Sequence, residues 1–89
     1  MKAIVTVTGV DHTGIVGAVA NALAELDTNI LNMSQTLMDH YFTMILQCEF
    51  DEKERPISAI QQRLDEVAQE QRLDIRMQSE AIFDAMHRL

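Results

Sequence analysis

The hydrophobic pattern begins as a strand and changes to a helix near residue 11. Alternate positions of residues 3–8 are apolar, which predicts one buried strand face; they are Ala3, Val5 and Val7. From Asp11 to Asp27 the apolar positions recur every three or four residues, which indicates a helix with one buried side. They are Ile15, Val16, Val19, Leu23 and Leu26. We expect Asp11 or Thr13 to cap the first turn of this helix.

The rest of the pattern predicts three more strands and two more helices. Residues 29–38 and 41–50 are extended segments, and Asp39-His40 between them suits a two-residue turn. The inward positions of the second segment are Phe42, Met44, Leu46, Cys48 and Phe50. Pro56 suits the first turn of a helix, whose apolar positions are Ile57, Ile60, Leu64 and Val67. Residues 73–78 alternate as a last strand, and a short amphipathic helix follows with Ile82, Phe83, Met86 and Leu89 on one face.

This order, β-α-β-β-α-β with an additional C-terminal helix, predicts an α+β sandwich of the ferredoxin-like type. We expect a single domain over residues 1–89, with a core in residues 1–79 and a tail helix in residues 80–89. The first and third strands are the most apolar and suit the centre of the sheet, whereas the second and fourth suit its edges. Ile4 and Ile45 would lie on the sheet face away from the first two helices. The tail helix or a second subunit would cover that face.

Composition and charge narrow the class of protein. The 89 residues carry a formal net charge of −7, which argues against binding to a nucleic-acid backbone. No apolar run approaches the roughly 18 residues of a membrane span. A chain with one cysteine has no disulfide framework, and a domain of this size commonly gains stability by oligomerisation. We therefore expect an acidic, cytoplasmic protein that forms a homodimer.

The loop between the first strand and the first helix is the main candidate for a binding site. Gly9 and Gly14 permit positive φ and close approach of the backbone, and the helix that follows offers unpaired N–H groups and a partial positive charge. Together these features suit a carboxylate. A tight turn that merely needs glycine explains the same spacing. Nucleotide hydrolysis is excluded, because Ile15 and Val16 stand where a phosphate-binding loop needs Lys and Ser or Thr.

The residues that could carry catalysis or bind a metal are scattered along the sequence. The three histidines, His12, His40 and His87, lie in separate elements without the short spacing of a metal site. Asp11 and His12 are neighbours, but only the hydroxyl of Ser34 might approach them as a nucleophile, and Cys48 lies on a buried face. We expect no enzyme activity, no metal and no cofactor, and we interpret His12 as a loop residue that contacts ligand or solvent.

Several segments together resemble the ACT domain family. The first strand ending in Gly9, the loop Asp11-His12-Thr13-Gly14-Ile15-Val16, and Asn29-Ile30 opening the second strand resemble that family as a whole. The segments 34–36, 41–45 and 82–89 resemble more narrowly the small stand-alone ACT proteins of bacteria and archaea, a family without an assigned function. The set is also similar to the ACT modules of the glycine cleavage repressor.

This resemblance implies a regulatory module that binds small molecules, commonly amino acids. It implies that two domains pair side by side into one eight-stranded sheet, with the ligand at their interface. The residues implied to bind the ligand come from two subunits; one provides Gly9, Asp11, His12, Thr13, Gly14, Ile15 and Val16, and its partner provides Asn29, Ile30 and Leu31. The alternative function is a protein-interaction module that regulates a separate protein without a small ligand.

Overall fold

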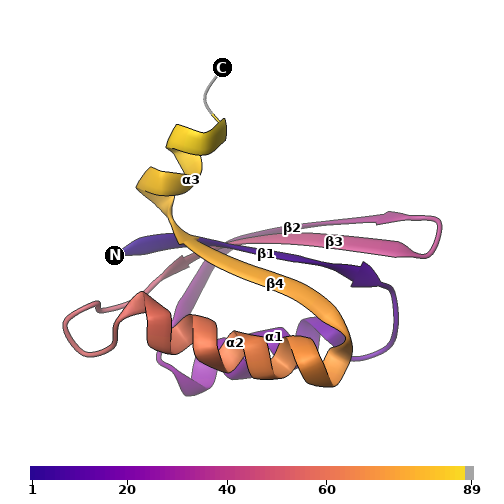
Figure 1. Cartoon of the computed structure of the whole chain (residues 1–89), viewed down its shortest axis with the longest axis horizontal. Coiled ribbons are helices and arrows are strands. Elements are labelled where there is room, and N and C mark those ends of the chain that lie inside the picture. The colour runs from indigo at the N-terminus through magenta and orange to yellow at the C-terminus, as the bar shows by residue number, and fades with distance from the viewer. Residues whose placement is uncertain (88–89) are drawn as a thin grey trace.

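The computed structural model describes the backbone of residues 1–87 and the side chains of residues 1–85, and it has the expected order of elements (Figure 1). The elements are β1 (Lys2–Val10), α1 (Ile15–Glu25), β2 (Asn29–Met38), β3 (Tyr41–Glu49), α2 (Ile57–Gln71), β4 (Leu73–Ser79) and α3 (Glu80–His87). The four strands form one antiparallel sheet in the order β2-β3-β1-β4. The ferredoxin-like fold and the positions of the edge strands are therefore confirmed.

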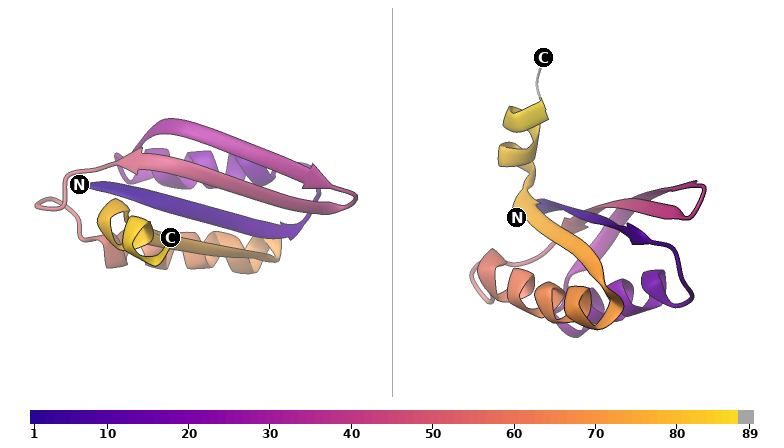
Figure 2. Two further views of the ribbon diagram at one scale, coloured as in Figure 1. Left: turned by 90° about the horizontal axis from the view of Figure 1, so that it is seen from above. Right: turned by 45° about the vertical axis from the view of Figure 1, so that its right-hand side comes forward.

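The helices α1 and α2 lie side by side on one face of the sheet, and the opposite face is bare apart from α3 at one end (Figures 1 and 2). The register explains which side chains face the helices. Val5 pairs with Leu46 on one side and Met77 on the other, so these three side chains point to the same face. All three are buried.

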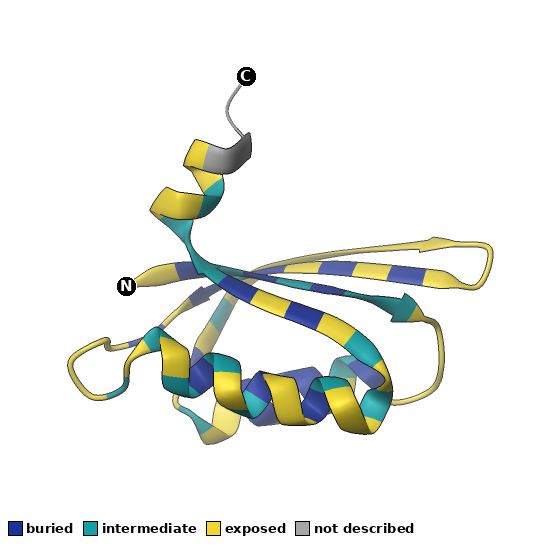
Figure 3. Cartoon of the chain, viewed as in Figure 1, coloured by how far each residue is buried: buried dark blue, intermediate teal, exposed yellow. Residues whose placement is uncertain are grey.

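The core lies between the sheet and these two helices. The inward positions that the sequence predicts for β3 and the following residue are all buried, and buried and exposed residues alternate along the strand (Figure 3). From the helices, Leu23 and Leu64 are fully buried against this face. Ile45 on the opposite face is 41% exposed, as the alternation requires.

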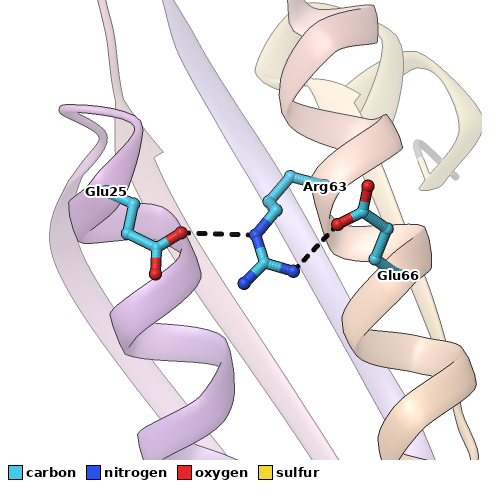
Figure 4. Close-up of polar contacts among 3 residues, drawn as sticks. All are labelled: Glu25, Arg63 and Glu66. Carbon is cyan, nitrogen blue, oxygen red and sulfur yellow. Dashed lines mark hydrogen bonds and ion pairs between the residues drawn. The ribbon is translucent and has the colours of Figure 1, made fainter.

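An arginine on α2 connects the two helices at the surface. Arg63 Nε donates to Glu25 Oε2 of α1 at 3.3 Å, and Arg63 Nη1 donates to Glu66 Oε2 at 3.1 Å (Figure 4). The hydrogen bond with Glu25 raises the pKa of Arg63 above its usual value. The side chain is partly exposed to solvent, so this contact contributes little to stability compared with the apolar core.

One edge of the sheet, β4, is closed by a side chain of α2. Gln61 Oε1 accepts a hydrogen bond from the Met77 N–H at 2.7 Å, and Gln61 Nε2 donates to the Ile75 carbonyl at 3.1 Å. Met77 and Ile75 lie opposite Val5 and Val7 of β1, whose backbone N–H and C=O groups point toward β3. The Met77 N–H and the Ile75 carbonyl therefore point away from the sheet. The amide of Gln61 thus takes the place that a further strand would occupy.

The other edge, β2, has no such cover from any residue that the structure describes. Its ten residues include no charged side chain, and every residue from Leu31 to Met38 is exposed. Met38 and Tyr41 flank the two-residue turn Asp39-His40 and form a hydrogen-bonded pair. Hydrogen-bonded and non-hydrogen-bonded pairs alternate along the strands, so the N–H and C=O groups of Met33, Gln35 and Leu37 face outward. The register shifts between Ile30 and Asn32, which leaves Leu31 in a bulge. A long uncharged edge of this kind favours pairing with another strand.

The tail helix α3 stands away from the sheet on the face opposite α1 and α2 (Figures 1 and 2). Ile82 is 55% exposed and Phe83 is only partly buried. The expected burial of Ile82 on this chain's own sheet is therefore wrong, because α3 rises from the end of β4 instead of folding back. Burial against a second subunit stays a prediction, and the side chains of Met86 and Leu89 lie outside the described part of the chain.

We expect Gln61→Ala to lower the free energy of unfolding by about 1–3 kcal/mol, because the Met77 N–H and the Ile75 carbonyl lose their partly buried partner. Urea denaturation of the variant beside the parent measures this change. Gln62→Ala is the matched control, since Gln62 is the exposed neighbour on the same helix. Equal destabilisation by both substitutions would contradict the role given to Gln61.

Candidate functional site

The glycine loop ends at Gly14, which begins α1 in the left-handed region with φ 93°. A side chain is strained at this φ, so the backbone itself requires glycine here. Among the described residues no side chain caps the helix, and the expectation that Asp11 or Thr13 does so is wrong. The first helical bond runs from the Ala18 N–H to the Gly14 carbonyl at 2.9 Å, which leaves the preceding N–H groups of the first turn facing outward.

Gly9 packs against β4. A Cβ at Gly9 would lie 2.7 Å from Leu73 Cδ2, the end of a flexible side chain that can move aside, and 3.4 and 3.5 Å from the Arg72 carbonyl oxygen and Leu73 Cα. A Cβ at Gly14, by contrast, would meet nothing within 4 Å. The close contact at Gly9 is thus with a movable side chain, while the space around Gly14 is open.

His12 contacts a residue far away in the sequence. Its Nε2 donates to the carbonyl of Gln71, the last residue of α2, at 2.8 Å, and its Nδ1 lies 3.2 Å from the Thr13 carbonyl. An imidazole at the C-terminus of a helix satisfies a carbonyl that the helix leaves unpaired. His12 thus connects the glycine loop to α2, a position that the sequence interpretation did not foresee.

A second backbone contact fixes the start of the loop to the β2–β3 hairpin. The Asp11 N–H donates to the His40 carbonyl at 2.8 Å. Of the remaining loop residues, Ile15 is buried in the core and Val16 is half-buried, so they can offer backbone groups more readily than side chains. The loop is held between the hairpin on one side and α2 on the other.

The second predicted part of the site, Asn29 to Leu31, lies at the opposite end of the sheet. Asn29 pairs with Glu49, which in turn pairs with Lys2 at the start of β1, whereas the glycine loop follows the end of β1. A strand rise of about 3.3 Å per residue puts these ends roughly 25 Å apart. One chain therefore does not bring the two parts together.

A hollow of about 590 Å³ lies beside the loop, on the side of α2 and β4. Its lining residues are Val10, Asp11, His12, Glu70, Gln71 and Arg72. The last three were missed by sequence reasoning, because they have no motif and are nearly sixty positions from the loop. The expected ferredoxin-like fold was the one signal that could have placed them there, because in the structure its first and fourth strands pair and set Gly9 opposite Leu73.

Two observations bear on catalysis and metal binding. Burial raises the pKa of the Cys48 thiol to about 11, so the group is a neutral core residue at neutral pH. Within the described residues, no group of three or more His, Cys, Asp or Glu side chains could hold a metal ion.

Over the same residues, no helix combines the length and the apolar character needed to cross a membrane.

Comparison with known proteins agrees with this geometry. The family model described as "ACT domain" matches residues 2–78. A UPF0237 protein of Corynebacterium glutamicum is 57% identical over 89 residues, which cover 100% of both chains. The solved structure of an ACT domain protein from Streptococcus pneumoniae has a TM-score of 0.83 and 42% identity, and the match covers 98% of each chain.

A more distant structure supports the fold alone. A putative glycine cleavage system transcriptional repressor has a TM-score of 0.77 at 19% identity, covering 86% of this chain and 44% of that one. The whole-length relatives and the family match together establish that this chain belongs to the ACT domain family, among the small proteins that carry the UPF0237 name.

Proposed function

We propose that this protein is a non-enzymatic regulatory domain that acts as a homodimer and binds an amino acid between its two subunits. ACT domains are in general regulatory modules that bind small molecules. The observation that carries the proposal for this chain is the uncovered edge of β2, which has ten residues, no charge and outward-facing backbone groups. A cytoplasmic location and a separate protein that responds to the dimer are parts of the same proposal.

A second copy of β2 is the strand that fits this edge best. In an antiparallel pair centred on Gln35, Met33 of one chain lies opposite Leu37 of the other, on the helix side of the sheet. These side chains are 47% and 58% exposed in a single chain, and the pairing would cover both. Two such sheets would join into one eight-stranded sheet, with the same surface used by both subunits.

This pairing would also complete the binding site. It sets the partner's Leu31 beside Asp39 in the hairpin turn. The same turn contacts the glycine loop, because the Asp11 N–H donates to the His40 carbonyl. The partner's Asn29 and Ile30 would follow toward the first turn of α1. The open space at Gly14 and the outward N–H groups of that turn suit the carboxylate of an amino acid.

Of the residues considered for catalysis, His12 and Cys48 have other uses in the structure. Both ring nitrogens of His12 contact backbone carbonyls, and Cys48 is a buried neutral thiol. Among the described residues, neither His12 nor Cys48 therefore has the arrangement of a general base beside a nucleophile. This supports a binding role over a catalytic one.

The alternative of a protein-interaction module rests on a different observation. The helix α3 stands away from the sheet and exposes Ile82. An amphipathic helix with an uncovered apolar side is a common docking element. On this alternative, α3 binds the regulated protein and the glycine loop takes no ligand.

We expect the parent protein to have about twice the chain mass of 10.1 kDa in light scattering, and Gln35→Pro to have the monomer mass. Proline removes an outward N–H that the second β2 strand needs, and an edge strand tolerates this loss. Gln35→Ala is the control, because it keeps the N–H and should stay dimeric. A monomeric parent, or a dimeric proline variant, would contradict pairing through β2.

Amino acids that bind should raise the melting temperature, since a ligand at 100 times its Kd adds about 2.7 kcal/mol. Calorimetric titration then tests the shared site. Gly14→Ala removes the part of the site that the glycine loop provides, and Leu31→Arg removes the part that the partner's β2 provides. Each variant alone should lose binding at the shared site. An equal mixture should recover about a quarter of the sites, because half of the dimers are mixed and each mixed dimer holds one intact site.

Circular dichroism of each variant shows whether it is folded, and Thr36→Arg, which puts the same charge on the same exposed strand, is the control for Leu31→Arg. Failure of the folded mixture to recover binding would contradict a site shared between subunits. If no amino acid shifts the melting temperature of the parent, the interaction module replaces the ligand-binding proposal.

A further inference from the structure

The hollow beside the glycine loop is a separate place from the shared site. It lies between the loop and the corner where α2 turns into β4, and one chain supplies all of its walls. The volume of about 590 Å³ falls within the range of roughly 300–1,000 Å³ that is usual for small-molecule pockets. A single chain can therefore hold a ligand here without a partner.

The walls of the hollow are fixed by backbone contacts and by one side chain. His12 Nε2 donates to the Gln71 carbonyl at 2.8 Å and joins the loop to α2. The Arg72 N–H donates to the Ala68 carbonyl, and Arg72 itself has a left-handed φ of 58° that turns the chain from α2 into β4. Gly9 packs directly against Leu73 below this turn. The hollow is thus preformed.

The charges that line the hollow are of both signs. The Asp11 carboxylate and the Arg72 guanidinium form no ion pair or side-chain hydrogen bond with any residue that the structure describes. Glu70 lines the hollow in the last turn of α2, where the helix dipole adds partial negative charge. One part of the hollow thus favours a cation, and Arg72 favours an anion.

We propose that this hollow binds a free α-amino acid with an aliphatic side chain, within a single chain. The ammonium group would lie among Asp11, Glu70 and the end of α2, and the carboxylate would receive the parallel N–H donors of Arg72. Val10, which is 55% exposed, offers an apolar wall for the side chain. This inference rests on the proposed function for the ligand class, but it places the ligand away from the subunit interface.

The probes are L-leucine, N-acetyl-L-leucine and L-leucine amide, titrated into the full-length protein and followed by amide chemical shifts. Leucine should shift the amides of Val10, His12 and Arg72. The acetylated and amidated probes each lack one charge, so each should bind at least about tenfold more weakly. Equal affinity of all three probes would overturn the proposal, because a zwitterion site requires both charges.

Arg72→Met should weaken leucine binding about tenfold or more while the fold is kept, since both residues adopt the same backbone conformation at equal cost. Arg76→Met is the matched control, because Arg76 is an exposed arginine on β4 that pairs with Asp74 outside the hollow. Asp11→Asn should also weaken binding. Unchanged affinity in the Arg72 and Asp11 variants would overturn the proposal.

The monomeric Gln35→Pro variant separates this inference from the proposed function. If the hollow is the site, Gln35→Pro should bind leucine as tightly as the parent does. If leucine binds the parent but not this folded variant, the hollow inference is wrong and the shared site stands. If no probe shifts any amide of the parent, the hollow inference is wrong, and the melting-temperature survey of other amino acids decides on the shared site by itself.

Discussion

The outward-facing backbone groups at the two edges of the sheet are the constraint on which the rest of the account depends. A four-stranded sheet leaves such groups on its first and last strands, and each edge must pair, be covered or face water. At β4 the amide of Gln61 accepts from Met77 and donates to Ile75, so this edge is already occupied. At β2 the exposed strand has no charge and no covering element. The β2 edge is therefore the one that the proposed function pairs, because a second copy brings a strand with the same requirement.

The same asymmetry determines where binding can occur. The glycine loop is held between the β2–β3 hairpin, through Asp11 and His40, and the end of α2, through His12 and Gln71. On the proposed function, a ligand on the hairpin side needs the partner's β2 to complete its walls, whereas the hollow on the α2 side has all of its lining residues in one chain. Both positions lie beside the same loop.

Much of the fold could be predicted from the sequence, because it depends on periodic burial. The alternation from Phe42 to Phe50 and the apolar spacing of the two long helices gave the core and the order of elements. The site could be predicted only in part. The roles of His12 and Gln61 depend on contacts with Gln71 and Met77 that only the tertiary fold creates. The cap of α1 differs because Gly14 adopts a left-handed conformation at the helix start, and the position of α3 was missed because amphipathicity does not say which surface a helix meets.

Hydrogen exchange of individual backbone amides is the most direct test of the edge asymmetry. The Met77 N–H donates to Gln61 and should be protected at every protein concentration. The N–H groups of Met33, Gln35 and Leu37 face outward in one chain, so they should be protected only in the dimer, and their protection should fall on dilution. Rapid exchange of these three amides at high concentration, under conditions where Met77 is protected, would contradict pairing of two chains through β2.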